Sequence, residues 1–136
     1  SEQFPKQAAE KGTYLLDKLR ESLADHPHVG DVRGLGLMCG IEIVQDKATK
    51  AEFPASDGIG AKIHAETQKR GLFSRLRGDV FCLAPPIVIS HEELDRVVDG
   101  AATEFEAQLK LMNWAYRIPI GRLDPYAWRY DDLPQL

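Results

Sequence analysis

The stretch "LFSRLRGDVFCLAPPIVISHEELDRVV", residues 72–98, decides the fold of this chain of 136 residues. Two short strand-like runs, 72–75 and 80–84, flank a Gly-Asp pair that suits a tight turn. We predict that these runs form two strands that pair as an antiparallel hairpin. Pro85 and Pro86 cannot donate hydrogen bonds to a sheet, so the second strand ends before them.

A helix follows the hairpin, and its start is marked by Ser90 and Glu93. At this spacing the two residues form a capping box, in which each side chain accepts a hydrogen bond from the backbone amide of the other. Apolar residues then recur at helical spacing, and they are Leu94, Val97, Val98, Ala101, Phe105 and Leu109. We predict a helix that buries this stripe against the rest of the domain.

Upstream, helix-like and strand-like segments alternate. Apolar spacing predicts a helix from about residue 5 to 25, which ends at the "DHPH" loop. The segment "RGLGLMCGIEIV" predicts a strand from about residue 37 to 44, followed by a polar loop. A second helix is predicted from about residue 58 to 70, where Gly71 closes it. The expected fold class is α+β, with a small antiparallel sheet covered by helices.

Length, charge and cysteine content limit the classes of function. A chain of 136 residues suits one domain, and a net charge of -4 with both signs interspersed argues against nucleic acid as a partner. No run approaches the roughly 20 apolar residues that cross a bilayer, so we expect no membrane partner. Cys39 and Cys82 stand in apolar runs, which predicts reduced core thiols and a cytoplasmic protein.

Two clusters suggest ligand sites, and neither has a complete set of groups. His26 and His28 with Asp25 and Asp31 lie in one loop without a second ligand cluster, so we predict a polar turn and no metal site. The segment "SDGIGAK" resembles a phosphate cradle, but its spacing is not that of a P-loop and a helix start explains it. All lysines lie in polar helices or loops, unlike the desolvated lysine of a Schiff base.

The order of the motifs is that of a known family. The segments "VGDVRGLGLMCGIEIVQDK", "RGL", "RGDVFCLAPPIVIS" and "EELDRVVD" follow one another along the chain. From about residue 7 to 108 the sequence resembles the carboxy-terminal domain of class III pyridoxal-phosphate-dependent aminotransferases, of the type that uses ω-amino acids or amines with pyruvate. The resemblance implies that residues 1–110 form the small domain of a fold type I enzyme. Residues 111–136, rich in aromatic residues and proline, depart from the family pattern as a tail of unknown role.

The resemblance also implies a reaction, a cofactor and partners. The complete enzyme is expected to use pyridoxal phosphate to transfer an amino group from an amine or ω-amino acid to a keto acid such as pyruvate. Its large cofactor-binding domain would carry the Schiff-base lysine, and the enzyme would be a homodimer acting on small amine, amino acid and keto acid substrates. We expect this chain by itself to hold no cofactor, to contain no catalytic residue and to be inactive.

One residue is assigned to the substrate through the resemblance. In the pyruvate-dependent branch an arginine just before the "GD" turn binds the substrate carboxylate, and this position is Arg75 here. A guanidinium can hold a carboxylate by two parallel hydrogen bonds, and on a mobile loop Arg75 could swing away to admit an amine. Arg77 either takes over this role or sits in solvent. The ornithine and acetylornithine branch has an arginine at or near Cys82, and a thiol there favours the pyruvate-dependent branch.

Two other functions stay open from the sequence. A free-standing domain of the same ancestry could bind carboxylates or dock a partner through its aromatic tail. An isolated fragment could have no activity at all. A large domain encoded in frame upstream of this chain would favour the aminotransferase.

Overall fold

The computed structural model describes residues 3–69 and 71–117. Its elements in chain order are α1 (Gln3–Leu23), β1 (Val29–Leu35), β2 (Met38–Ile43), a short 3-10 helix (Ala55–Asp57), α2 (Ile59–Lys69), β3 (Arg75–Arg77), β4 (Val80–Leu83) and α3 (His91–Arg117). The three predicted helices are confirmed, and α3 continues through residues 111–117 of the predicted tail. The rest of that tail, residues 118–136, lies outside the described residues. The boundary between domain and tail stays a prediction.

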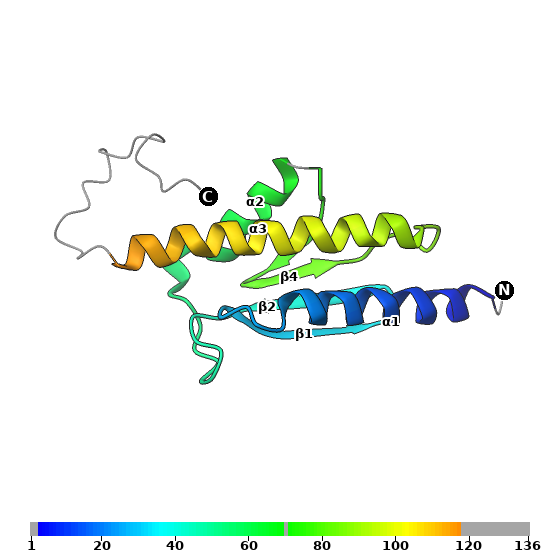
Figure 1. Ribbon diagram of the computed structural model, residues 1–136, viewed down its shortest axis with the longest axis horizontal. Coiled ribbons are helices and arrows are strands. Elements are labelled where there is room, and N and C mark those ends of the chain that lie inside the picture. Colours follow the sequence, from blue (N-terminus) through cyan, green and yellow to red (C-terminus); the bar gives the residue numbers. More distant parts are fainter. Residues whose placement is uncertain (1–2, 70, 118–136) are drawn as a thin grey trace.

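The strands form one four-stranded antiparallel sheet in the order β1-β2-β4-β3. Helices α1 and α3 run side by side over one face of the sheet, and α2 packs beside α3 near β3 (Figure 1). A hydrogen bond of 2.7 Å from the Tyr14 hydroxyl to the Asp95 carboxylate joins α1 to α3. The predicted α+β class, a small antiparallel sheet covered by helices, is therefore confirmed.

The core lies between the helices and the covered face of the sheet. The sheet contributes alternate residues, of which Ile41 and Phe81 are fully buried cross-strand partners. The helices contribute apolar positions at helical spacing, which are Leu15, Leu19, Leu23, Ile59, Ile63, Leu94, Val98, Ala101 and Phe105. Among the described residues, none of these three helices covers the opposite face of the sheet, which is called the open face below.

The sequence pattern predicts no strand at residues 29–35, whereas the structure has β1 there. The pairing of β1 with β2 is irregular between Val29 and Asp31, so that Val29 and Gly30 are both buried. This irregularity breaks the alternation by which a strand is recognised, and glycine and aspartate are uncommon in strands. The turn into β2 begins at Gly36, whose φ of 56° suits the first position of a two-residue hairpin loop.

The predicted hairpin of β3 and β4 is confirmed, but β3 begins at Arg75 rather than at Leu72. The Leu72 amide donates to the Thr67 carbonyl over 2.9 Å, which ties Leu72 to the end of α2 and delays the strand. The two-residue loop begins at Gly78, where φ is 60°. Glycine adopts such a left-handed conformation without the strain that a side chain would add.

The predicted capping box at the start of α3 is also confirmed. The Glu93 amide donates to the Ser90 hydroxyl over 3.1 Å, and the Ser90 amide donates to the Glu93 carboxylate over 2.8 Å. The hydrogen bond from the Ser90 amide lowers the pKa of the Glu93 carboxyl below its ordinary value. The box begins α3 directly after the Pro85–Ser90 connection that follows the hairpin.

The turn between β1 and β2 lies directly against α1. A side-chain carbon added at Gly12 would lie 1.9 Å from the Gly36 carbonyl oxygen, far inside contact distance. The glycine is therefore required by the close approach of two backbones. A second helical glycine, Gly100 in α3, has a different environment, because its nearest neighbour would be a Leu72 methyl group at 3.8 Å.

We expect Gly12→Ala and Gly100→Ala to change stability in opposite directions. Alanine stabilises a helix relative to glycine by about 0.5–1 kcal/mol, and Gly100→Ala should gain up to this amount. At position 12 the clash with a backbone carbonyl should outweigh the gain and cost about 1–3 kcal/mol. Urea denaturation of the two variants measures both effects. Stabilisation by Gly12→Ala would show that α1 can move away from the turn at no cost.

Candidate functional site

The open face of the sheet carries a row of four residues that come from all four strands. The pairing places Arg33 opposite Gly40, Gly40 opposite Cys82, and Cys82 opposite Arg75. Residues directly opposite one another in an antiparallel sheet share a face. Arginines thus stand at both ends of the row, and the two positions between them carry a hydrogen atom and a small thiol.

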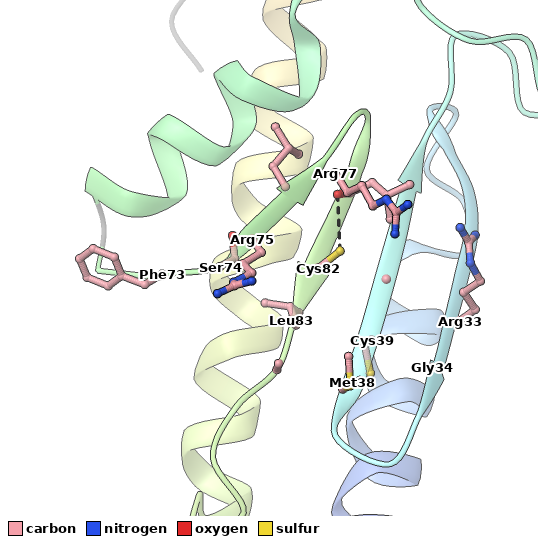
Figure 2. A pocket seen from close by; sticks show the side chains of 14 residues that line it. Arg33, Gly34, Met38, Cys39, Phe73, Ser74, Arg75, Arg77, Cys82 and Leu83 are labelled. Carbon is pink, nitrogen blue, oxygen red and sulfur yellow. Dashed lines mark hydrogen bonds between the residues drawn. The ribbon is translucent and has the colours of Figure 1, made fainter.

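A cavity of about 780 Å³ lies over this row (Figure 2). It is lined by Arg33, Gly34, Met38, Cys39, Gly40, Phe73, Ser74, Arg75, Leu76, Arg77, Val80, Cys82, Leu83 and Ala84. Three of these residues are cationic and none is acidic. The face also presents two exposed apolar side chains, Phe73 at 77% and Met38 at 71% relative exposure. The cavity is therefore a cationic site with an apolar border.

The three arginines of the cavity differ in their partners. The Arg33 guanidinium lies 2.7 Å from a Glu42 carboxylate oxygen and 3.2 Å from an Asp31 carboxylate oxygen. The hydrogen bonds to these carboxylates raise the pKa of Arg33. Neither Arg75 nor Arg77 has an ion pair within the part of the chain that the structure describes. The charge still available for an anionic ligand is therefore that of Arg75 and Arg77.

The backbone at Arg75 belongs to the sheet, in agreement with the predicted strand at residues 72–75, and the mobility of this segment stays a prediction. Arg75 is the first residue of β3 and pairs with Cys82 on β4. Its side chain is exposed and can turn by rotation of its own bonds. Arg77 lies two residues further along the same face and also lines a second cavity of about 430 Å³. The site thus has two neighbouring guanidinium groups on one short edge strand.

The two cysteines lie on opposite faces of the sheet. Cys39 is buried in the core, and burial raises the pKa of its thiol. Cys82 is only half-buried and lines the cavity, so its prediction as a core thiol is wrong. The reason is alternation, because Phe81 and Leu83 point into the core and turn Cys82 outward. The Cys82 thiol contacts the Val80 carbonyl oxygen at 3.7 Å (Figure 2).

Sequence reasoning did not assign Gly40 and Ser74 to the site. Glycine inside a strand is a signal for close approach to a ligand or another backbone, and this signal could have pointed to Gly40. Ser74 carries no such signal. Its hydroxyl is buried beside the cavity and has no hydrogen-bond partner among the described residues. Unsatisfied buried polar groups are uncommon in folded proteins, and this one directly precedes Arg75.

The other candidate clusters are occupied by contacts within the protein. His26 Nδ1 accepts a hydrogen bond from the His28 amide, and His28 Nδ1 lies 3.0 Å from the Val44 carbonyl oxygen. Within residues 3–69 and 71–117, no three His, Cys, Asp or Glu side chains gather as a metal site would require. At the start of α2 the Gly60 amide binds the Asp79 carboxylate over 3.2 Å, in the place that a phosphate would need.

The described helices include none that is long and apolar enough to span a membrane. No lysine is among the residues that line either cavity described above. A cofactor held through a Schiff base therefore does not fit the residues of these cavities.

Comparison with known proteins gives the family of this domain. The family model of class III aminotransferases matches residues 1–103, and the chain belongs to this family. The complete enzymes of this family depend on pyridoxal phosphate. An uncharacterised aminotransferase from Schizosaccharomyces pombe is 42% identical over 101 residues, which cover 68% of this chain and 22% of that protein.

Two further similar proteins are a transaminase named for its substrates and an omega-transaminase of known structure. A diaminobutyrate–2-oxoglutarate transaminase from Halomonas elongata is 38% identical over 67% of this chain and 20% of its own length. The crystal structure of an (S)-enantioselective omega-transaminase from Thermomicrobium roseum is 41% identical, with a TM-score of 0.74. That match covers 79% of this chain and 24% of the solved one. The chain thus spans about a fifth to a quarter of the length of these relatives.

We expect the two thiols to differ in reactivity because they face opposite sides of the sheet. In the folded chain, iodoacetamide should alkylate Cys82 roughly tenfold or more faster than Cys39, since the thiolate must be formed and accessible. Mass spectrometry of timed samples measures both rates. Cys82→Ser should abolish the fast phase and Cys39→Ala should preserve it. Equal rates would contradict the outward orientation of Cys82.

Proposed function

We propose that this chain is the carboxy-terminal small domain of a pyridoxal-phosphate-dependent class III aminotransferase and that Arg75 binds the carboxylate of its keto acid substrate. The observation that carries the proposal is the cavity on the open face, which is lined by arginines and by no acidic residue. Arg33 is already paired with carboxylates of the protein, whereas Arg75 has no ion pair within the described part of the chain. An anionic substrate group would complete its coordination.

The geometry of Arg75 suits a carboxylate that binds in only one half of the reaction. A guanidinium offers two parallel hydrogen bonds to a carboxylate, and its long side chain can turn toward solvent when the other substrate is an amine. The strand holds the Cα atom in place while the side chain remains exposed. One site can therefore receive a keto acid such as pyruvate and then an amine or ω-amino acid.

Cys82 supports the choice of substrate class. It lies directly opposite Arg75, at the position where the resemblance puts an arginine in the ornithine and acetylornithine branch. A thiol there supplies no second charge for an α-carboxylate. The similar protein from Thermomicrobium roseum is an omega-transaminase, which agrees with an amine donor. The Halomonas elongata relative is named for 2-oxoglutarate, and this dicarboxylate is the competing acceptor.

The remaining parts of the active site would come from outside this domain. We place the Schiff-base lysine and the phosphate-binding groups in a large domain, and we propose a cytoplasmic homodimer as the complete enzyme. The exposed Phe73 and Met38 beside the cavity would pack against that large domain. The small domain would then close the substrate side of the active site.

Replacement of Arg75 in the complete enzyme should affect the two half-reactions differently. A charge-assisted hydrogen bond contributes about 1.5–3 kcal/mol, and only a substrate with a carboxylate loses it. We expect Arg75→Ala to lower kcat/KM for pyruvate by roughly tenfold to a hundredfold and to leave simple amines nearly unchanged. Arg75→Lys should restore part of the loss, because an ammonium keeps the charge but not the planar fork. Single-turnover kinetics separates the half-reactions.

Arg77→Ala is the matched control, because it removes the same group two residues along the same strand. We expect its effect on pyruvate to be much smaller. Equal losses in both half-reactions of Arg75→Ala would assign Arg75 to the fold. A selective loss in Arg77→Ala alone would move the carboxylate-binding role to Arg77. If Arg75→Ala lowered kcat/KM for 2-oxoglutarate and not for pyruvate, the proposed acceptor would change and Arg75 would keep its role in carboxylate binding.

The chain of 136 residues alone should not bind pyridoxal phosphate covalently at a defined site. The described cavities offer no lysine, and surface lysines react only weakly and without selection. We expect borohydride treatment after incubation with the cofactor to label several lysines at low levels, as read by peptide mass spectrometry. Stoichiometric labelling of one lysine would mean that this chain holds the cofactor itself.

A further inference from the structure

We infer that His64 is a positioning residue for Arg75. The inference rests on the proposed function of Arg75 and adds a residue of α2 to it. His64 Nε2 lies 3.0 Å from the carbonyl oxygen of Ser74, the residue that precedes Arg75. A carbonyl oxygen can only accept, so Nε2 carries the hydrogen and donates it. The side chain of His64 thus holds the peptide group through which the chain enters β3.

This hydrogen bond acts on the direction of the Arg75 side chain. The Ser74 carbonyl and the Arg75 amide belong to one planar peptide unit, which turns as a whole. Rotation of this unit changes φ of Arg75 and with it the direction in which the side chain leaves the backbone. By fixing the carbonyl, His64 fixes where the guanidinium can reach in the cavity.

The strand ladder holds only one side of this peptide unit, because Arg75 is the first residue of β3 and pairs with Cys82, whereas the Ser74 carbonyl lies before the strand. β3 has three residues, lies at the edge of the sheet and pairs only with β4. Before β3, the Leu72 amide donates a hydrogen bond to the Thr67 carbonyl over 2.9 Å, which fixes Leu72 to the end of α2. Ser74 lies between this fixed point and Arg75. The His64 side chain on α2 holds the Ser74 carbonyl in place.

His64 is itself well placed to act as a fixed point. It is half-buried on α2, and its ring meets the buried ring of Phe81 at 64° with centroids 6.3 Å apart. The fully buried Thr67 donates its hydroxyl hydrogen to the His64 carbonyl over 2.9 Å. The donor that orients the Ser74 peptide is therefore anchored in the core rather than in solvent.

The test compares two amides at position 64 in the complete aminotransferase. Gln places its amide nitrogen near the position of Nε2 and can still donate to Ser74, whereas the shorter Asn cannot reach it. We expect His64→Asn to lower kcat/KM for the keto acid about fivefold, as the loss of one hydrogen bond would, and to leave the amine half-reaction unchanged. His64→Gln should retain most of the wild-type value. His64→Leu, which keeps the contact with Phe81 but lacks a donor, replaces Asn if that variant does not fold.

A second set of variants separates positioning from stability. His28 is also half-buried, and its Nδ1 lies 3.0 Å from a backbone carbonyl oxygen, that of Val44, outside the lining of the cavity. Because Leu removes the donor at both positions, His28→Leu is the matched control for His64→Leu. It should change the denaturation midpoint without changing the ratio of the two half-reactions. The same change in ratio for both histidine variants would overturn the inference.

The decisive measurement is a double-mutant cycle with Arg75→Gln. If His64 acts through Arg75, His64→Asn should cause no further loss for the keto acid in the Arg75→Gln background. A full additional loss would show that His64 acts independently and would overturn the inference. If Arg75→Gln is selective but no His64 variant is, only the positioning role fails. If Arg75→Gln itself shows no selectivity, the proposed function fails and this inference with it.

Discussion

The burial of Phe81 determines which side chains of β4 face the core and which face the cavity. Its ring is fully buried, lies opposite Ile41 and Leu76 in the sheet, and meets the Phe105 ring edge to face with centroids 5.6 Å apart. Aromatic pairs in this geometry stabilise by about 0.5–1.5 kcal/mol beyond the burial of their area. Because side chains alternate along a strand, the inward direction of Phe81 turns Cys82 to the open face, opposite Arg75.

The parts of the fold that the sequence predicted are those with strong local signals. The helix before the "DHPH" loop and the capping box of Ser90 and Glu93 depend on neighbouring residues, and such patterns survive in the folded protein. β1 was missed because its glycines and its irregular start leave no clean alternation. β3 was placed three residues early because apolar Leu72 looks like a strand residue, whereas its hydrogen bond to Thr67 joins it to α2. That bond and the one from the Gly71 amide to the Gln68 carbonyl form the local cap of α2, so the cap extends past Gly71 and takes Leu72 with it.

The sequence predicts Arg75 as a residue of the candidate site, but it does not predict which other residues line the site. The resemblance predicts the position of the arginine and the hairpin pattern places it in a strand, but neither predicts the row that it shares with Cys82 and Gly40. Those relations depend on register between strands far apart in sequence, which a single sequence does not determine. Cys82 was assigned to the core because its neighbours are apolar, although alternation within that run sends every second side chain to the other face. Apolar composition therefore predicted a strand but not its orientation.

The charge of the whole chain says little about the charge of this face. The net charge is -4, yet the cavity on the open face is lined by three arginines and no acidic residue. At physiological salt the Debye length is about 8 Å, so distant carboxylates are screened and the nearest charges dominate. The carboxylates of Asp31 and Glu42 neutralise Arg33 at the β1 end of the row. Within the part of the chain that the structure describes, the arginines of this cavity without an ion pair are thereby concentrated at the β3 end, where Arg75 and Arg77 lie.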